Sequence, residues 1–426
     1  MYFINRINIT GFWGEKKVNI KFGPTENFLI GVNGSGKTTI INLLAGCIEA
    51  DFYTLDRIQF DKVIVYLTGS TNKKHKARLV VTKEENDKTP FQNIRFQIFK
   101  GRELTFEIFL DDLEEDRILR NRSYQRHLFF EDTRYHRKDL QHELQQLFNT
   151  SWLSIHRFKT NFRRHEERSH ESLVDQKLNQ FLENFNSYLN ELNRKSKDEN
   201  DKFQKYIFLS LLSTQSESQI YQTLRSIDLD KEKESLSQIY SLFNIEEKDY
   251  SNKLNNYIKN FNQALEKSNE ERISFRDAEF LIGMKRIHSV IQEWQKLLHK
   301  QDVINESKTN FMEVVNNLLQ RKELVVNNRN ELVVKTQSGK NFHPNHLSSG
   351  EKQLLIIFGE ALLQKSEPHI FIADEPELSL HIEWQESLVR SLKILNPYAQ
   401  MIFATHSPDI VGTYQDSVIR IENTIE

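Results

Sequence analysis

The chain has 426 residues, of which 28% are charged and 38% hydrophobic, and its formal net charge is −2. This length allows two or three hydrophobic cores, and the near-neutral charge excludes a global electrostatic attraction to nucleic acid or membranes. Cys47 is the single cysteine, which excludes an intrachain disulfide and a cysteine-based zinc cluster and fits a reducing compartment.

Strand-like segments fill the first hundred residues. The N-terminus alternates apolar and polar residues and lacks the continuous apolar core of a signal peptide, and no apolar run approaches the ~20 residues of a membrane span. We therefore expect a soluble, cytoplasmic protein with no membrane partner. The predicted strands here are YFINRINI, KVNIKF, NFLIGV, KVIVYLTG, ARLVVTK and IRFQIF.

A long helical region follows. No proline lies between residues 91 and 343, and Gly283 is the only glycine between Gly101 and Gly339, so helix breakers are almost absent. Within this region, a four-three spacing of apolar residues is typical of either a short coiled-coil seam or an amphipathic helix packed on a bundle. The residues with this spacing are Leu178, Leu182, Phe185, Leu189 and Leu192.

Strands and helices alternate again near the C-terminus, where ELVV, HIFIAD, QMIFAT and SVIRI are interleaved with GEKQLLIIFGEALLQK and EWQESLVRSLKIL. This alternation at both ends, with helices between, predicts one α/β domain split by a helical insertion. We expect the N-terminal part of the head at 1–160, the insertion at 161–322 and the C-terminal part of the head at 323–426.

The stretch GVNGSGKT has the spacing of a phosphate-binding loop, which begins at Gly31. Its glycines let successive N–H groups point at phosphate oxygens, and the helix after it presents its positive end to the same phosphates. Lys37 is expected to contact the β- and γ-phosphates and the Thr38 hydroxyl to bind Mg²⁺. The alternative is a glycine-rich turn with an accidental Lys-Thr pair. The residues expected at the nucleotide are Asn33, Gly34, Ser35, Gly36, Lys37, Thr38 and Thr39.

Two carboxylates, Asp374 and Glu375, stand at the end of the hydrophobic strand HIFIAD. A parallel sheet would deliver them to its ligand-binding edge, and adjacent residues of an extended chain point in opposite directions. Asp374 therefore suits the Mg²⁺ shell, and Glu375 suits activation of the attacking water as general base. Two acids that merely open a Pro-Glu loop are the alternative.

Two further segments favour the same chemistry. His406 follows the apolar strand MIFAT, where it could hydrogen-bond the γ-phosphate; a structural histidine is the alternative. Ser348, Ser349 and Gly350 precede a long apolar helix whose free N–H groups make an anion site, with an ordinary Ser-capped helix as the alternative. Because one phosphate loop already serves each nucleotide, a second anion site makes sense if it meets a nucleotide held by another copy of the chain.

In order, GVNGSGKTT, LSSGEKQ, FIADEPELSLH and ATHS resemble the phosphate loop, signature, acidic strand with its dimer loop, and switch histidine of ABC-type ATPases. The resemblance covers the two ends of the chain and not the insertion. It implies an α/β, ABC-type P-loop ATPase head with an antiparallel β subdomain and a helical, partly coiled-coil-like insertion. It also implies ATP and Mg²⁺ as ligands, and a head-to-tail homodimer or higher homo-oligomer with two ATPs between Lys37 of one protomer and Ser348–Gly350 of the other.

The signature departs from the transporter form, because Ser349 stands where the first of two glycines is usual and Glu351 where glutamine is common. This version is similar to soluble ABC ATPases related to the overcoming-lysogenisation-defect, recombination and chromosome-structure proteins. The whole layout resembles the ATPase subunits of Septu- and PARIS-type anti-phage systems. The glutamine that usually completes the metal shell is missing: the strand SWLSIHRFK (151–159) offers Arg157, which faces the nucleotide or the insertion or lies on the surface.

Residues 116–138 carry six arginines and Lys138 against three acids, a local net charge of +4 (seven minus three), with aromatic residues interleaved. Such a mixture can hold a nucleic-acid backbone and stack bases, but the acidic run DDLEED just upstream also allows a salt-bridged helix pair. The insertion has no metal-site or triad spacing, so we expect it to be an interaction surface.

These patterns favour an ATPase that acts as a switch. ATP closes the dimer, hydrolysis to ADP and phosphate opens it, and the insertion passes the change to an effector, by resemblance a nuclease or toxin of the same defence system. The alternative is a DNA-repair or DNA-end-binding ATPase, with DNA binding that weakens when Arg120, Arg122 and Arg126 are neutralised. The long insertion and altered signature disfavour a transporter subunit, and the lack of a further acidic cluster disfavours a nuclease.

Replacing Lys37 with Ala should abolish nucleotide binding, because it removes the ammonium expected to pair with the β- and γ-phosphates. Titration with a fluorescent ATP analogue measures the binding, and circular dichroism checks that the variant is folded. A dissociation constant equal to that of the wild type would contradict the phosphate-loop assignment.

Overall fold

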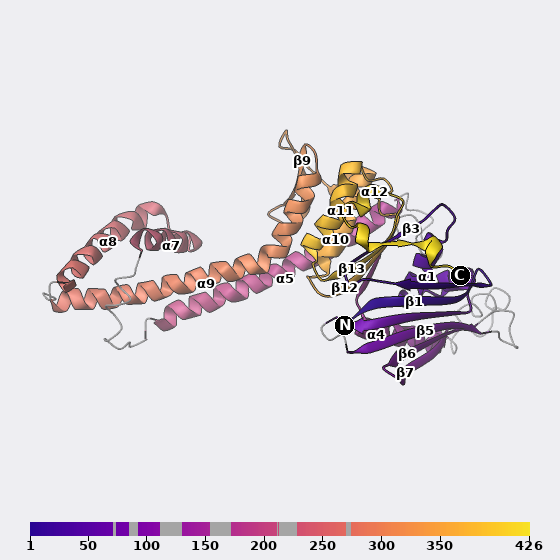
Figure 1. Cartoon of the computed structure of the whole chain (residues 1–426). Coiled ribbons are helices and arrows are strands. Elements are labelled where there is room, and N and C mark those ends of the chain that lie inside the picture. Colours follow the sequence, from indigo (N-terminus) through magenta and orange to yellow (C-terminus); the bar gives the residue numbers. More distant parts are fainter. Residues whose placement is uncertain are drawn as a thin grey trace. The chain divides into compact units, whose positions relative to one another are not determined.

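The structure is a computed structural model, and its parts are labelled in Figure 1. The chain divides into two compact units, one of residues 1–186 with 307–426 and one of residues 187–306. The structure describes residues 1–70, 74–84, 93–110, 130–153, 172–210, 212, 228–269 and 274–426.

Six strands of the first unit form an antiparallel sheet in the order β2-β1-β4-β5-β6-β7. Apolar and polar residues alternate along these strands, so that Ile7 and Ile9 of β1 and their partners Val65 and Val63 of β4 are buried on one face. The strands are β1 (Tyr2–Phe12), β2 (Lys16–Lys21), β4 (Lys62–Gly69), β5 (Lys76–Glu84), β6 (Asn93–Lys100) and β7 (Glu103–Leu110).

The second sheet of this unit is parallel, in the order β14-β3-β13-β12-β8. Its central strands are almost continuously buried, as expected for a parallel sheet covered on both faces. Because β3, β13 and β12 are neighbours, the loops that follow them leave the same edge of the sheet. The strands are β3 (Glu26–Ile30), β8 (Thr150–Leu153), β12 (His369–Asp374), β13 (Ala399–Ala404) and β14 (Val418–Arg420).

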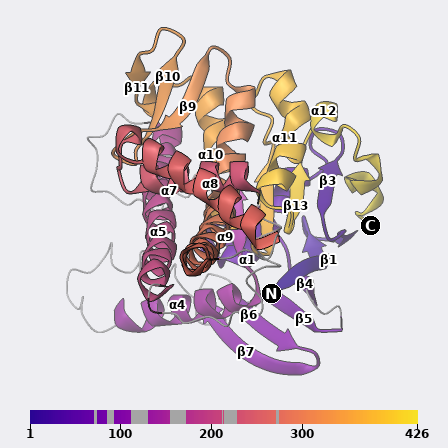
Figure 2. The same ribbon diagram turned by 90° about the vertical axis from the view of Figure 1, so that its left-hand side faces the viewer.

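Helix α1 (Lys37–Glu49) joins the two sheets into one hydrophobic core. Its residues Ile40 and Leu44 are fully buried in the same cluster as Ile7 of the antiparallel sheet and Ile402 of the parallel sheet. Helix α4, which lies beside β6 and β7 in Figure 2, adds to this core. Further helices of the unit are α2 (Phe52–Arg57), α4 (Phe130–Leu147), η2 (Pro344–His346), α10 (Ser349–Leu363), α11 (Ile382–Leu395), α12 (Pro408–Val411), η3 (Gln415–Ser417) and η4 (Ile421–Asn423).

A small antiparallel sheet, β11-β10-β9, precedes the signature segment in the chain. At its β9 edge, the side-chain amide of Asn316 donates to the Leu324 carbonyl at 3.1 Å and accepts the Leu324 N–H at 2.6 Å. The amide therefore takes the place of a neighbouring strand at this point. The strands are β9 (Lys322–Val326), β10 (Leu332–Thr336) and β11 (Asn341–Phe342).

The second unit is helical. Two long helices run into it from the first unit, and two shorter ones lie within it. A buried cluster holds them together, with Phe203 of α5, Leu236 of α7, Leu254 of α8 and Trp294 of α9. The helices are α5 (Leu173–Ser210), α7 (Leu229–Leu242), α8 (Glu247–Asn269) and α9 (Phe275–Leu318).

Helices α5 and α9 lie side by side within this unit, as Figure 1 shows. Lys300 of α9 donates to Glu199 of α5 at 2.8 Å, and the neighbouring Gln301 donates to Asn200 at 2.8 Å. Phe181 of α5 contacts Phe311 of α9, and Phe203 of α5 contacts Trp294 of α9, with ring centroids 6.1 and 5.4 Å apart. The two helices therefore run antiparallel, in agreement with the expected coiled-coil-like part of the insertion.

The predicted α/β class, antiparallel subdomain and helical insertion are confirmed. Each segment predicted as a strand contributes to one, and ELVV occurs twice, in β9 and in β10. Strand β7 goes beyond the predicted set; it follows a turn at Gly101, whose φ is +66°. Of the apolar residues spaced along α5, Leu182 is half-buried and the others are buried.

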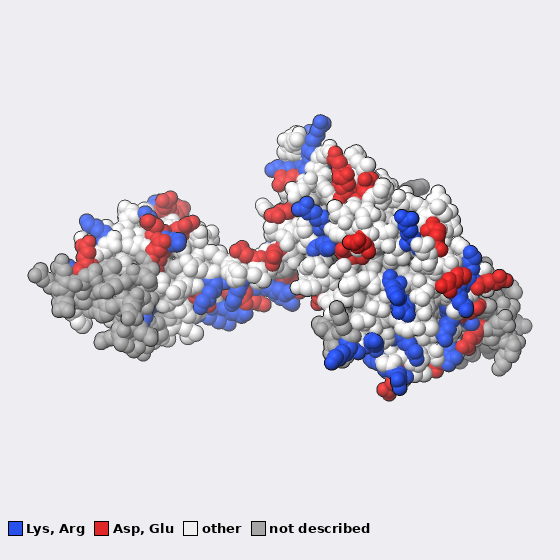
Figure 3. All heavy atoms as spheres, in the orientation of Figure 1, with Lys and Arg blue, Asp and Glu red and all other residues white. Residues whose placement is uncertain are grey.

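Charged side chains of both signs are spread over the face shown in Figure 3, in keeping with the net charge of −2. Among the described residues, no helix is both long and apolar enough to cross a membrane. Arg157 and the side chains of the basic segment 116–138 lie outside the described residues.

Helices α5 and α10 of the first unit approach each other closely at Gly359. A Cβ atom at this glycine would lie 2.1 Å from the Phe181 ring, which is itself buried. Phe181 packs in turn against Phe185 and Phe311, with ring centroids 5.7 and 6.1 Å apart, so the ring has no room to retreat. Gly359 therefore sets the distance between the base of α5 and α10.

We expect Gly359→Ala to lower the stability of the protein by about 1–3 kcal/mol, because the added methyl group overpacks the Phe181 contact. Gly283→Ala is the matched control, since Gly283 also lies within a helix but a Cβ there would meet nothing within 4 Å. The control should keep or raise the midpoint of thermal unfolding. Equal midpoints for the two variants would contradict the close contact.

Candidate functional site

Residues 31–36 form the turn between β3 and α1. Gly34 and Gly36 have positive φ angles of 79° and 97°, and a Cβ on Gly36 would lie 3.1 Å from the Trp13 ring. Both the backbone angle and the close contact require glycine at position 36. Gly36 is also the N-cap of α1, so the free N–H groups of the first helical turn lie at this loop.

The Lys37 ammonium lies against this turn. Its Nζ donates to the carbonyl oxygens of Gly31 at 2.8 Å and Val32 at 3.2 Å, and the residue is only 5% exposed. Burial lowers the pKa of Lys37, and nearby carboxylates oppose that shift. In decreasing order of effect, these carboxylates belong to Glu375, Glu422, Asp374 and Glu377.

Thr38 and Asp374 meet across the sheet edge. The Thr38 hydroxyl donates to Asp374 Oδ1 at 3.2 Å, although 336 residues separate them in the chain. The strand register explains the contact, because Ala404 of β13 pairs with Leu29 of β3 on one side and with Asp374 of β12 on the other. The structure thus brings the phosphate loop and the acidic strand together.

Glu375 and His406 also lie at this edge. Glu375 has a left-handed backbone with φ of +48°, held by its N–H, which donates to the Ala404 carbonyl at 2.8 Å. Such strain in a residue other than glycine gathers at functional sites. His406 follows β13 after one residue, and its side chain is exposed.

The signature segment begins α10 with a capping box. Ser348 N–H donates to Glu351 Oε2 at 2.9 Å, and Glu351 N–H donates to Ser348 Oγ at 3.4 Å. Burial raises the pKa of Glu351, but the bonds from Lys322 and Ser348 outweigh it, so that the pKa lies below its usual value. Ser348 is therefore a helix cap, as the alternative interpretation expected.

Ser349 and Gly350 occupy the first turn of α10. The backbone at Gly350 is crowded by the neighbouring loop: a Cβ there would lie 2.4 Å from the Ser379 carbonyl oxygen. Among the hydrogen bonds of the described residues, none joins Ser348–Gly350 to the loop 31–39 of the same chain. The structure therefore places Gly350 against the loop that follows β12.

Three residues outside the predicted set contribute to the site: Trp13, Glu377 and Glu422. Trp13 is 44% exposed, stacks on Phe12 with ring centroids 4.6 Å apart, and borders Gly36. Its place between two glycines in GFWG was the available signal, because a tryptophan in a tight turn has little core to enter.

Glu422 reaches the phosphate loop from the C-terminal segment. Its Oε1 accepts the Val32 N–H at 2.7 Å, and this bond lowers the pKa of Glu422. A single acid in a polar tail carries no sequence signal for such a contact.

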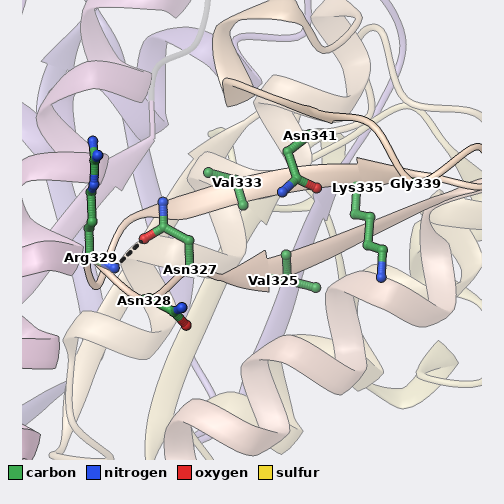
Figure 4. A pocket seen from close by; sticks show the side chains of 8 residues that line it. All are labelled: Val325, Asn327, Asn328, Arg329, Val333, Lys335, Gly339 and Asn341. Carbon is green, nitrogen blue, oxygen red and sulfur yellow. Dashed lines mark hydrogen bonds between the residues drawn. The ribbon is translucent and has the colours of Figure 1, made fainter.

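A separate hollow of about 530 Å³ lies on the small sheet, lined by β9 and β10 residues and by the turn at Asn327 and Arg329 (Figure 4). The Arg329 N–H donates to Asn327 Oδ1 at 2.8 Å and shapes that turn. The hollow shares no residue with the loop 31–36, with β12 or with His406.

A family model described as "AAA domain, putative AbiEii toxin, Type IV TA system" matches residues 27–412, which include the phosphate loop, the acidic strand and His406. The chain belongs to this family of ATPases. The matched range also spans the helical insertion.

The chain is also similar to the retron Vc95 probable ATPase of Vibrio cholerae serotype O1 biovar El Tor, with 28% identity over 176 residues. The match covers 38% of this chain and spans 30% of the length of that relative. Among solved structures, an Smc head domain with an extended coiled coil from Pyrococcus furiosus has a TM-score of 0.45 at 14% identity, over 96% of this chain and 91% of that one. An Smc head domain with a coiled coil and joint from Pyrococcus yayanosii has a TM-score of 0.39 at 16% identity, over 96% and 93%.

Proposed function

We propose that this chain is an ATP-binding and ATP-hydrolysing switch of the ABC type, which closes into a head-to-tail dimer with ATP and opens after hydrolysis. The observation that carries the proposal is the meeting of the phosphate loop with Asp374 at the edge where His406 also lies. Ligands of parallel α/β sheets bind at this edge. Membership of an ATPase family supports the same activity.

The loop is suited to hold the phosphates through the N–H groups of the first turn of α1 and through Lys37. A magnesium ion fits the donors present, because the Thr38 hydroxyl and the Asp374 carboxylate are oxygen ligands that already face each other at 3.2 Å. When bound, the ion would neutralise phosphate charge. The Ser35 hydroxyl is buried and has no hydrogen-bond partner among the described residues, as expected for a donor whose partner is a bound phosphate.

Glu375 takes the role of general base that orients and deprotonates the attacking water. Glu375 lies just beyond β12 and its backbone is left-handed, so the alternation expected for an extended chain does not apply to it; the turn itself gives it a different direction from Asp374, which would serve the metal. His406, exposed at the end of the next strand, would donate a hydrogen bond to the γ-phosphate and so distinguish ATP from ADP.

Trp13 is proposed to bind the nucleobase. The indole is half-exposed beside the phosphate loop, and its contact with Phe12 holds the ring in place. Stacking on an aromatic face is tolerant of base identity, so this residue would add affinity and little selectivity among nucleotides.

The second protomer would complete each site with its signature segment. The capping box satisfies the N–H groups of Ser348 and Glu351, whereas the N–H groups of Ser349 and Gly350, in the first helical turn, have no partner within the helix. Ser348 and Ser349 are exposed. This combination suits capture of a phosphate that another copy of the chain presents.

The start of α10 is linked to the first of the insertion helices. Lys352 donates to Asp175 in the first turn of α5 at 2.6 Å, and this bond lowers the pKa of Asp175. The Gly359–Phe181 contact joins the same two helices two turns further on. A movement of α10 on nucleotide binding would therefore act on the base of α5.

The second insertion helix is linked to the same region. Lys322, four residues beyond α9, donates to both oxygens of Glu351 at 2.9 Å. Trp384 of α11 donates from its indole to the carbonyl of Leu318, the last residue of α9, at 3.1 Å. Both long helices are thus tied to the signature region, and they supply the route by which the state of the dimer would reach the insertion.

The insertion is then the surface that controls an effector, for which we propose a nuclease or toxin of a bacterial anti-phage defence system. The similarity to a retron ATPase and a family description that names a toxin–antitoxin system support this placement. The resemblance of the whole layout to the ATPase subunits of Septu- and PARIS-type systems is in keeping with it.

Replacing Glu375 with Gln should lower ATP turnover about 100- to 10,000-fold, because the amide cannot accept the proton of the attacking water. ATP binding should persist, and ATP should hold a larger fraction of the variant than of the wild type as dimers. Phosphate release measures the turnover, and light scattering measures the dimer fraction. Glu383→Gln is the control, since Glu383 is exposed in the first turn of α11. Turnover of Glu375→Gln near the wild-type value would rule out this mechanism.

Trp13→Ala should weaken ATP binding about 10-fold, the loss expected for one stacked base, with turnover at saturation changed less. Trp13→Phe keeps an aromatic face and should restore most of the affinity. Competition by inorganic tripolyphosphate, which has no base, should be the same for the wild type and Trp13→Ala. An equal loss for tripolyphosphate would show that the variant damages the phosphate loop instead.

A further inference from the structure

Glu377 binds the loop that carries His406. Its Oε1 accepts three hydrogen bonds, one from the side chain of Thr405 and two from the backbone N–H groups of the residues that follow. The Thr405 hydroxyl and the His406 N–H each lie 2.7 Å from this oxygen, and the Ser407 N–H lies 3.2 Å away. One carboxylate oxygen therefore fixes the backbone at the histidine proposed to sense the γ-phosphate.

The loop that carries Glu377 also contacts the signature helix. Gln353 of α10 donates to the Pro376 carbonyl at 3.3 Å in a buried bond. Three residues further on, the Ser379 carbonyl fills the space that a Cβ at Gly350 would need. Glu377 thus lies between two contacts with α10, and it cannot shift without affecting the helix that the partner's nucleotide would touch.

Two further hydrogen bonds also join the loop that carries His406 to the segment after β12. Ser407 Oγ donates to Gln385 Oε1 at 2.6 Å, and Gln385 Nε2 donates to the Leu380 carbonyl at 2.9 Å. The loop of Thr405, His406 and Ser407, here called the switch loop, is therefore bonded near both ends of residues 375–381, the segment between β12 and α11. Glu377 supplies the attachment nearer to Glu375.

The second oxygen of Glu377 takes no part in holding the loop. Its Oε2 is buried and has no hydrogen-bond partner among the described residues. A buried oxygen without a partner costs free energy, and a neutral side chain could accept the three bonds of Oε1 without leaving a charged oxygen in this position. A carboxylate here instead gives charge-assisted bonds, which are stronger and more directional.

We propose that Glu377 is a positioning residue that sets the place of His406 at the γ-phosphate and links it to the signature helix. The proposal rests on the proposed function, in which His406 acts on the nucleotide. A shift of His406 on release of phosphate would pull on Glu377, and the loop 376–379 would carry that shift to α10. Loss of the signature contact would then follow loss of the γ-phosphate within one protomer.

A double-mutant cycle with His406 tests the proposal. Glu377→Ala should lower kcat about 100-fold with KM for ATP within about threefold, because a misplaced group costs turnover more than binding. If Glu377 acts through His406, then Glu377→Ala added to His406→Ala should lower kcat by less than about threefold more. Glu377→Gln keeps an acceptor oxygen and should restore kcat to within about 10-fold of the wild type.

The positioning role would be overturned if the two substitutions lowered kcat by independent factors that multiply in the double variant. It would also be overturned if Glu377→Ala raised KM and left kcat unchanged. Thermal unfolding of each variant identifies any that fails to fold; if Glu377→Ala does, the cycle is run with Glu377→Asp, whose shorter side chain withdraws the oxygen from the loop of His406, and the same criterion holds. Glu383→Ala is the control on α11 and should keep the wild-type kcat. The Glu375→Gln measurement separates the two proposals: its failure removes the proposed function, whereas multiplicative losses with an inactive Glu375→Gln remove the role of Glu377 alone.

Discussion

The parallel pairing of three strands is the constraint on which the rest of this structure depends. Ala404 pairs with Leu29 on one side and with Asp374 on the other, so β3, β13 and β12 end at one level. Segments from the start and the end of the chain therefore share one edge, and none needs a long loop to reach it. Backbone pairing and the packing of the buried side chains around α1 hold these strands in register.

The loop between β12 and α11 is the second organising feature. It contacts the switch loop through Glu377 and the signature helix through Pro376 and Ser379. The signature helix in turn bonds Asp175 in the first turn of α5 through Lys352, and it bonds Lys322 of β9, just beyond α9, through Glu351. Most of these contacts are polar and short, so they depend on orientation, and a small rotation breaks them where an apolar contact would slide.

The sequence predicts the parts of the site that end apolar strands. The phosphate loop, Asp374, Glu375 and His406 each follow a strand whose hydrophobic run is plain, and the parallel sheet brings them to one edge. Their chemical roles stay predictions. Contacts set by turns and by distant segments could not be predicted in this way: Glu422 lies 390 residues from Val32, and no periodicity links the two.

Packing between remote helices is hidden for a similar reason. From the sequence, Gly359 is only a residue that disfavours a helix. The structure explains why glycine is required there, because Phe181 of another helix fills the space that a side chain would occupy. Strand β7 depends on the turn at Gly101, whose positive φ reverses the chain so that the next alternating segment pairs with β6. In both cases the deciding fact is a three-dimensional neighbour that the local pattern does not contain.

The Asn316 amide has a consequence for how other molecules can approach the base of the insertion. By bonding both backbone groups of Leu324, it blocks β9 as a template for another strand at that residue. A flexible peptide, or a misfolded copy of the same chain, therefore cannot pair with β9 as a further strand at this residue. A partner that binds this edge at Leu324 must therefore be recognised through side chains.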